Sequence, residues 1–265
     1  MVAKSQRYLD YEASDRALAA MPKEYPPSCL IPVHFHGRAQ IVFAVAGVME
    51  ITAGRQSWVI PPQRALWVPA GVAHAMRAHG AVSLRTLYVR QDAVPQGAPQ
   101  NCRAVQVSPL LRELLVRAAN MRMDYDEQGH EGRIMRLILD ELRWHSQPPL
   151  LLTMPISARL VAICEALRGD AADPRTLNEW ARELGCTTRT IARDFQAETG
   201  ASFLNWRHQA RLLAALRLLH EGESVLSAGQ VVGYETASAF TAMFKRLMGC
   251  TPSQYLGDTR MSETA

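Results

Sequence analysis

The sequence predicts an α+β protein with an N-terminal antiparallel β-barrel, two bridging helices and an all-α C-terminal part that contains two helix-turn-helix motifs. Three observations lead to this prediction. Residues 28–90 form short β-branched or aromatic runs separated by turn residues, which is typical of antiparallel sandwiches and barrels. From Ser108 onward, apolar residues recur at helical spacing. After Pro155 the chain is helical throughout, so we expect the strands first and the helices afterwards.

The predicted strands of the barrel are separated by the turn signals "AGR", "PPQR" and "PAG", in which glycine and proline interrupt the apolar runs. The runs themselves read "IVFAVAGVMEITA", "QSWVIP", "ALWVPAG", "HAMRAH" and "VSLRTLYV". The stretch "RQDAVPQGAPQNC" then breaks the pattern, and we interpret it as an exposed connection to the helices.

Two amphipathic helices are predicted after the barrel. The first, "SPLLRELLVRAANMRM", begins with Ser108 at the N-cap and Pro109 at the first helical position. The second lies in "HEGRIMRLILDELRWHS". Two interpretations stay open, since these helices can pack on the barrel or form the seam of a homodimer. The prolines that follow, Pro148, Pro149 and Pro155, indicate a linker.

A helix-turn-helix motif begins at Thr176 and Glu179, which have the spacing of a capping box. The helix opened by this box ends at Gly185, and a second helix follows in "TTRTIARDFQAETG". Ala181 is small enough to face the crossing of two helices that are joined by a tight turn.

The same arrangement returns further along the chain. The anchor pairs, each 49 positions apart, are Phe195 and Phe244, Gly200 and Gly249, and Trp206 and Tyr255. A duplicated motif arises by chance far less often than a single one. Between the copies, "FLNWRHQARLLAALRLLHEG" predicts a long helix that begins after Ser202 and stops at Gly222. A rigid helix of this length is suited to holding two helix-turn-helix motifs on one face of a DNA duplex.

The stretch "TLNEWARELGCTTRTIARDFQAETGASFLNWRHQARLLAALRLL", followed by "GYETASAFTAMFKRLMGCTPSQY", resembles the DNA-binding domain of the AraC/XylS family of bacterial transcription regulators. Gly229 departs from the family, which usually has alanine at this position. Because glycine weakens a helix by about 1 kcal/mol relative to alanine, we expect the second motif to be the softer one.

The candidate DNA-binding residues are the outward positions on the second helix of each motif. By helical periodicity, Ile191, Phe195, Phe240 and Phe244 face the core. The outward set is Thr188, Arg189, Ala192, Arg193, Ala237, Ser238, Thr241, Ala242, Lys245 and Arg246. We expect the two α-helical arginines of the first motif to contact guanine or phosphate, the small residues to offer hydroxyl or methyl groups, and the last two residues to hold phosphates.

Net charge alone does not indicate nucleic acid. The chain has a formal charge of +4, but all of the excess lies in residues 1–155, which carry 17 basic and 13 acidic side chains. Residues 156–265 carry 12 of each. The prediction of DNA binding therefore depends on where the basic side chains lie.

Two short motifs of the barrel resemble those of the cupin family. His34, His36, Gln40 and Gly47 fit HxH-x3-E-x6-G with glutamine in place of glutamate, and "PAGVAH", which ends at His74, fits PxG-xx-H. Ala78 stands where the second motif usually ends in asparagine.

The cupin resemblance implies that His34, His36, Gln40 and His74 converge on a single divalent metal ion. Three imidazoles and an amide oxygen suit an ion such as Fe, Ni, Zn, Mn or Cu, whose identity stays open. The alternative is that the histidines line a pocket for an organic effector.

Together the two resemblances imply a sequence-specific DNA-binding transcription regulator whose cupin barrel senses a metal ion or a small effector. Within the family the chain most resembles the NimR-like and RipA-like group. The expected partners are double-stranded promoter DNA, a second copy of the chain, a small-molecule effector and, for an activator, RNA polymerase. An alternative is a cupin metalloenzyme, a dioxygenase or isomerase, fused to a DNA-binding domain. Gln40 and the lack of another acid-base group in the barrel argue against it, and a barrel that is only a scaffold is a third possibility.

The predicted boundaries are a sensory barrel at 1–100, a helical dimerisation and linker segment at 101–155, the DNA-binding domain at 156–258 and a tail at 259–265. No run of about 18 apolar residues occurs, and the start lacks a secretory pattern, so we expect no membrane partner and a cytoplasmic, nucleoid-associated protein. The five cysteines never show CxxC spacing, which indicates reduced structural thiols.

Overall fold

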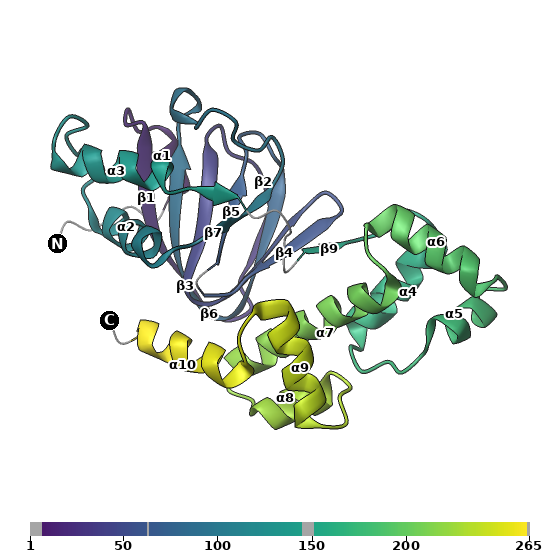
Figure 1. Ribbon diagram of the computed structural model, residues 1–265. Helices are drawn as coiled ribbons and strands as arrows, with labels where there is room; N and C mark the ends of the chain where they lie inside the picture. The colour runs from purple at the N-terminus through teal and green to yellow at the C-terminus, as the bar shows by residue number, and fades with distance from the viewer. Residues whose placement is uncertain (1–6, 63, 145–150, 264–265) are drawn as a thin grey trace. The chain divides into compact units, whose positions relative to one another are not determined.

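A computed structural model describes residues 7–62, 64–144 and 151–263 of the chain, which divides into two compact units (Figure 1). The first unit consists of residues 1–54 and 60–148, and the second of residues 55–59 and 149–265. The first is rich in strands and the second is helical, which confirms the predicted α+β class. In the described residues, no helix is both long and apolar enough to cross a lipid bilayer.

The first unit is built on an antiparallel sheet in which β6 is the central strand. One side of β6 pairs along its length with β3, and its other side pairs with β1 in one half and with β2 in the other. Beyond β3 the order continues through β5, β7 and β8. The strands are β1 (Leu18–Tyr25), β2 (Leu30–His34), β3 (Ala39–Ala53), β5 (Arg64–Val68), β6 (His74–Val89), β7 (Arg103–Gln106) and β8 (Arg143–Trp144).

Gly47, the glycine of the first cupin motif, lies where the β3–β6 register shifts. Its φ is +73°, a conformation that favours glycine, and a Cβ there would collide with the carbonyl oxygen of Ala81 on the neighbouring strand. Backbone geometry therefore accounts for this motif residue.

The two bridging helices pack on the sheet. They are α2 (Pro109–Asn120) and α3 (His130–Asp140); the shorter helical pieces of this unit are α1 (Tyr8–Glu12) and η1 (Gln91–Ala93). Leu111, Leu115 and Ile138 are buried in one core with Ile41 and Leu87 of the sheet. Ser108 caps α2 by accepting a hydrogen bond from the amide of Leu111, as its position predicted.

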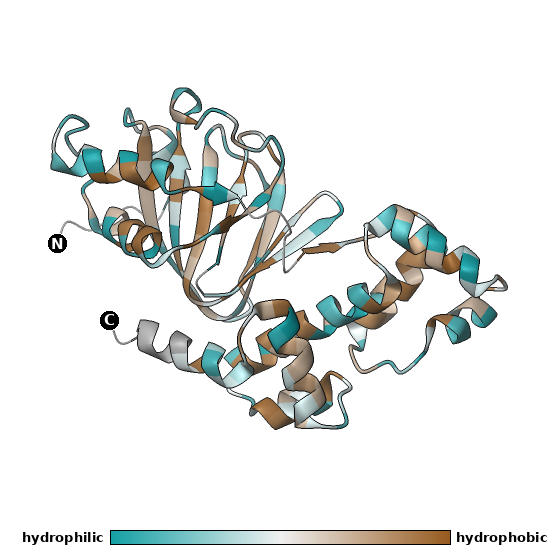
Figure 2. Ribbon diagram, viewed as in Figure 1, coloured by the Kyte–Doolittle hydropathy of each residue, from teal (hydrophilic) through white to brown (hydrophobic). Residues whose placement is uncertain are grey.

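The second unit contains two helix-turn-helix motifs joined by one long helix. Its helices are α4 (Ala158–Gly169), α5 (Leu177–Glu183), α6 (Thr188–Thr199), α7 (Phe203–His220), α8 (Val225–Val231), α9 (Ala237–Met248) and α10 (Pro252–Glu263). Strand β9 (Leu151–Thr153) pairs antiparallel with β4 (Gln56–Ile60). Hydrophobic and hydrophilic bands alternate along α6 and α7 in Figure 2, as expected of helices with one buried face.

The predicted helix ends of this unit are confirmed. The capping box between Thr176 and Glu179 is formed in both directions, and Ser202 caps α7. Gly200 and Gly249 end α6 and α9 in the left-handed conformation, with φ of 75° and 81°. The two motifs bury separate cores, one around Phe195 and Trp206 and the other around Phe244 and Tyr255, and α7 contributes to both.

Candidate functional site

Three histidines of the first unit converge at one end of the sheet. His34 ends β2 and lies opposite His74, the first residue of β6, while His36 lies between β2 and β3. The ring centroids are 4.4 Å apart for His34 and His74, 4.9 Å for His34 and His36, and 5.4 Å for His36 and His74. One ligand nitrogen from each ring can be chosen so that all three lie within 4.8 Å of one another.

The hydrogen bonds of this histidine cluster leave Nε2 of His34 and Nε2 of His74 available. Nδ1 of His34 donates to the carbonyl of Pro32 at 2.8 Å, and Nδ1 of His74 donates to the carbonyl of Val72 at 2.9 Å. Because a carbonyl oxygen can only accept a hydrogen bond, both rings carry their proton on Nδ1. The lone pair of Nε2 is therefore free to bind a ligand.

Several buried polar atoms of the two cupin-like motifs lack a hydrogen-bond partner among the described residues. They are Nε2 of His74, both ring nitrogens of His36 and Oε1 of Gln40. Gln40 is 3% exposed and lies near the start of β3. Leaving such atoms unpaired costs about 1–3 kcal/mol each, so unpaired atoms grouped in this way indicate a ligand that they bind.

Burial keeps His36 and His74 of the cluster neutral. The pKa of His36 is lowered to about 3, chiefly by burial and further by His34 and His74. The pKa of His74 is lowered by burial, while its bond to the carbonyl of Val72 opposes this shift. Neutral imidazoles have the lone pairs that a metal ion requires, so the three histidines and the amide oxygen of Gln40 fit a borderline divalent ion.

A carboxylate that the sequence analysis did not single out lies beside the cluster. Oε1 of Glu12, the last residue of α1, is 3.3 Å from Nδ1 of His36. The ring of Tyr8, also from α1, stands edge-on to the His36 ring with the centroids 5.0 Å apart. No local pattern could have revealed this approach, because it joins segments more than twenty positions apart.

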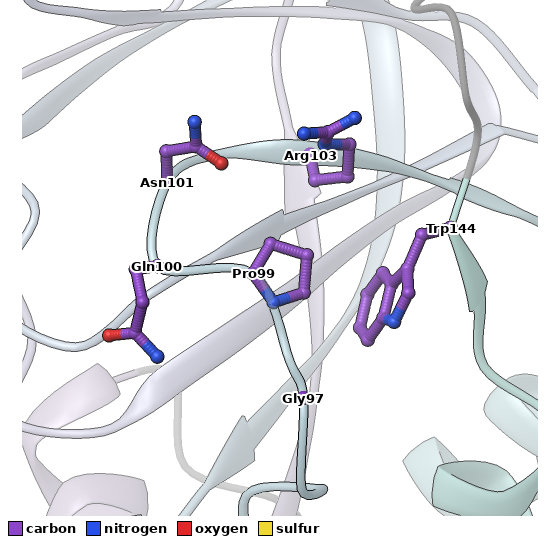
Figure 3. Close-up of a pocket in the computed structure, with 6 residues that line it drawn as sticks. All are labelled: Gly97, Pro99, Gln100, Asn101, Arg103 and Trp144. Atoms are coloured by element: carbon purple, nitrogen blue, oxygen red, sulfur yellow. The ribbon is translucent and has the colours of Figure 1, made fainter.

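A hollow elsewhere in the first unit differs from the histidine cluster. It has a volume of about 590 Å³ and is lined by Gly97, Pro99, Gln100, Asn101, Arg103 and Trp144. Figure 3 shows the ring of Pro99 facing the indole of Trp144 across it. None of these side chains is among the buried polar atoms without a partner in the described residues, so the histidine cluster is the stronger candidate for a ligand site.

The first predicted DNA-reading face lies on α6. Thr188, Arg189, Ala192 and Arg193 are all exposed, whereas Ile191 and Phe195, which share their helix, are fully buried. Arg193 is held by Asp194, whose Oδ1 lies 3.0 Å from Nη2. In the described part of the chain, no hydrogen bond or ion pair engages Arg189, which leaves its guanidinium available to a partner.

The second predicted face lies on α9 and is less basic. Ala237, Ser238 and Ala242 are exposed and Thr241 is half-buried. Lys245 and Arg246 are exposed in the last turn of the helix. Phe240 and Phe244 point into the core, as the periodicity predicted. The two faces thus differ, since α6 offers two guanidinium groups where α9 offers small side chains followed by a basic pair.

A duplicated helix-turn-helix, preceded by a sheet domain with converging buried polar groups, defines the class of DNA-binding transcription regulators that carry a ligand-binding domain. Models of known families agree: a helix-turn-helix domain matches residues 180–258, and an AraC-like ligand binding domain matches residues 26–131. The HTH-type transcriptional regulator NimR of Escherichia coli is 32% identical over 227 residues, which cover 85% of this chain and 82% of that protein. The chain belongs to the AraC family of transcription regulators.

Two further comparisons cover different parts of the chain. The HTH-type transcriptional regulator RipA of Corynebacterium glutamicum is 34% identical over 122 residues, 46% of this chain and 35% of that protein. A crystal structure of ToxT from Vibrio cholerae aligns with 92% of this chain and 98% of that chain, at 10% identity and a TM-score of 0.38. NimR and RipA are both named as transcription regulators, so the prediction of a DNA-binding transcription regulator is confirmed.

Proposed function

We propose that this regulator binds one divalent transition-metal ion through His34, His36, His74 and Gln40, and that the bound ion changes the affinity of the second unit for promoter DNA. The observation that carries the proposal is the convergence of three histidine rings, two of which have buried nitrogen atoms without a hydrogen-bond partner among the described residues. A metal ion would bind Nε2 of His74, one ring nitrogen of His36 and Oε1 of Gln40 at once. Gln40 contributes no charge, which favours a borderline ion over a hard one.

The regulatory effect would be a shift between two populations of the chain. A ligand changes an equilibrium only as far as it binds the two states with different affinity. We therefore expect the metal-loaded protein and the metal-free protein to bind the same operator with different affinities. The sign of this difference would decide whether the metal acts as inducer or corepressor.

The DNA-binding residues in this proposal are those of the two exposed faces. Arg189 and Arg193 would contact guanine bases or phosphates at one major groove. Lys245 and Arg246 would contact phosphates at the next major groove. The small residues that complete the faces are Thr188, Ala192, Ala237, Ser238, Thr241 and Ala242.

A homodimer formed through α2 and α3 also belongs to this proposal, together with contact to RNA polymerase if the protein activates. Leu110 and Leu137, on these helices, are 49% and 39% exposed, which supports an apolar contact with a second copy. The division at residues 100, 155 and 258 is likewise proposed for the barrel, the helical segment and the DNA-binding domain.

Metal content tests the proposed site directly. Untagged protein purified without chelators should contain about one divalent ion per chain by elemental mass spectrometry, and His36→Ala should lose it. The matched control is His79→Ala, because His79 is a half-buried histidine of the same sheet that pairs instead with Glu50 at 3.0 Å. Wild-type protein that stays free of metal after incubation with divalent ions would refute the proposal, and the histidines would then be assigned to an organic effector.

A further inference from the structure

We propose that Glu12 is a positioning residue of the histidine cluster, which orients His36 through Nδ1 so that Nε2 faces the metal. This inference rests on the proposed metal site. It assigns to α1 a role that neither cupin motif contains, and it supplies the carboxylate that Gln40 lacks.

The side chain of Glu12 is held between two adjacent residues of the first motif. Its Oε1 accepts a hydrogen bond from the amide of Gly37 at 2.8 Å and lies 3.3 Å from Nδ1 of His36. A small rotation of the imidazole turns the second contact into a hydrogen bond. His36 is 4% exposed and Glu12 is 21% exposed, so the carboxylate is largely shielded from water.

The backbone of Glu12 is anchored by the same motif. Arg38, a buried residue, donates from Nε to the carbonyl of Glu12 at 3.1 Å and from its other nitrogens to the carbonyls of Ser14 and Arg16. The stretch "HFHGRAQ" therefore contains three of the proposed metal-binding residues as well as the two residues that fix Glu12. A carboxylate held on both its backbone and its side chain is well placed to orient a neighbouring ring.

Comparison of the three histidines shows what Glu12 provides. His34 and His74 each donate Nδ1 to a carbonyl two residues earlier in the chain. For His36 the nearby acceptor is the carboxylate of Glu12 instead. Metal-binding histidines usually donate their second nitrogen to a carbonyl or carboxylate, which fixes the tautomer and raises the basicity of the ligand. Glu12 would complete this pattern for the third ring.

Charge gives a second reason for a carboxylate at this place. Three neutral imidazoles and an amide leave the charge of a buried divalent ion uncompensated, and a buried unpaired charge is costly. Glu12 lies on the Nδ1 side of His36, and its Oε1 is already bound by the amide of Gly37, so it acts across the ring rather than as a direct ligand.

The test replaces Glu12 by glutamine, which keeps the size of the side chain and an oxygen acceptor for Gly37 but removes the negative charge. Asp10→Asn, which makes the same charge change on α1, is the matched control. Affinity for Co²⁺ is measured by equilibrium dialysis on the full chain, with folding checked by circular dichroism. We expect E12Q to bind about 10–100-fold more weakly than wild type and D10N to bind like wild type.

A spectroscopic readout separates an effect on His36 from a general loss of structure. In the Co²⁺-loaded protein, each coordinating imidazole with its proton on Nδ1 gives one exchangeable, strongly shifted proton resonance. We expect E12Q to lose or shift the resonance of His36 while those of His34 and His74 persist. Glu12→Asp, which keeps the charge, should recover part of the affinity.

The outcomes distinguish the two proposals. Equal affinity and identical resonances in E12Q and wild type would overturn the role of Glu12 and leave the metal site intact. Loss of all three resonances together would assign Glu12 to general stability and would also overturn it. Wild type and D10N that both fail to bind Co²⁺, while folded, would refute the metal site and this inference with it.

Discussion

Single residues on α6 differ in how firmly the protein itself holds them. Arg193 is paired with Asp194, which also binds Arg159 at 2.6 Å, so contact with DNA must compete with an existing ion pair. Arg189 has no such competitor in the described residues. We expect Arg189→Ala to weaken binding to the proper operator by about 1–3 kcal/mol, and Arg193→Ala to cost less.

Fluorescence anisotropy on a footprinted operator and on a scrambled sequence measures both variants. A loss confined to the operator would assign Arg189 to base recognition, and an equal loss on both sequences would assign it to phosphate. Unchanged affinity on the operator would remove Arg189 from the reading face.

Two histidines of the second unit make its stability depend on pH. His208 and His220 each bond a tyrosine hydroxyl at 2.9 Å, those of Tyr234 and Tyr255, and burial lowers the pKa of each histidine to about 4. The unfolded chain takes up these protons near pH 6.5, whereas the folded chain does so only near pH 4. Unfolding therefore binds protons in this window, and stability falls as the pH is lowered through it.

The expected result is a urea midpoint of the helical unit that decreases as the pH is lowered from about 7 to about 4. His220→Gln should flatten this dependence, because it removes one of the two groups. Far-UV circular dichroism follows the transition. A wild-type midpoint that stays constant over this range would show that folding does not lower the pKa of either histidine.

At the scale of elements, the two helices of each helix-turn-helix motif cross in the same way, but the residues that meet at the crossing differ between the two motifs. Ala181 and Gly229 each lie four residues before a glycine of positive φ, Gly185 and Gly233. A Cβ on Gly229 would lie 3.1 Å from Cγ of Phe240, closer than ordinary packing allows. In the first motif the residue equivalent to Phe240 is the smaller Ile191. The large ring thus occupies the space of the missing methyl group, which explains why the second motif departs from alanine.

Gly229→Ala therefore has two opposing effects. The helix gains about 1 kcal/mol from alanine, but overpacking of a core costs about 1–3 kcal/mol. Phe240 is fully buried against the rings of Tyr234 and Phe244 and has little room to shift, so we expect a net loss of about 1 kcal/mol. Chemical denaturation measures it.

A double-mutant cycle with Phe240→Ile supplies the control. The combination reproduces the Ala and Ile pair of the first motif, so alanine at 229 should be less harmful beside isoleucine than beside phenylalanine. Additive effects of the two changes would contradict size compensation.

Local patterns predicted these elements well, because caps, positive-φ glycines and helical periodicity depend on residues within a few positions of one another. The cluster of three histidines was also predictable, since strand pairing sets His34 opposite His74 and His36 lies two residues further along the chain. Glu12 was not, because its approach to His36 depends on how α1 packs on the sheet. Residues 55–59 likewise lie within the predicted barrel in sequence but belong to the second unit, where β4 pairs with β9.

For the whole molecule, the distribution of charge determines how DNA binding responds to salt. The chain has 29 basic and 25 acidic residues, but residues 156–265 carry no net charge. The proposed DNA faces concentrate four cations, Arg189, Arg193, Lys245 and Arg246, against this neutral background. Each phosphate contact lowers the slope of log Kobs against log salt concentration by about 0.9.

We therefore expect the full chain to bind its operator with a slope of about −3 to −4 for each chain bound, because at most four phosphate contacts are available on these faces. Titrations from low to physiological salt measure the slope, and Lys245→Ala should make it shallower by about 1. Serine substitution at Ala197, an exposed position of α6 outside the predicted set, is the control and should leave the slope unchanged.

A slope near −10 would mean that many more basic residues touch the duplex. Residues 156–265 carry eight basic side chains besides these four, and residues 1–155 carry the +4 excess, so such a slope would call for alanine substitutions in both parts of the chain to find the additional contacts.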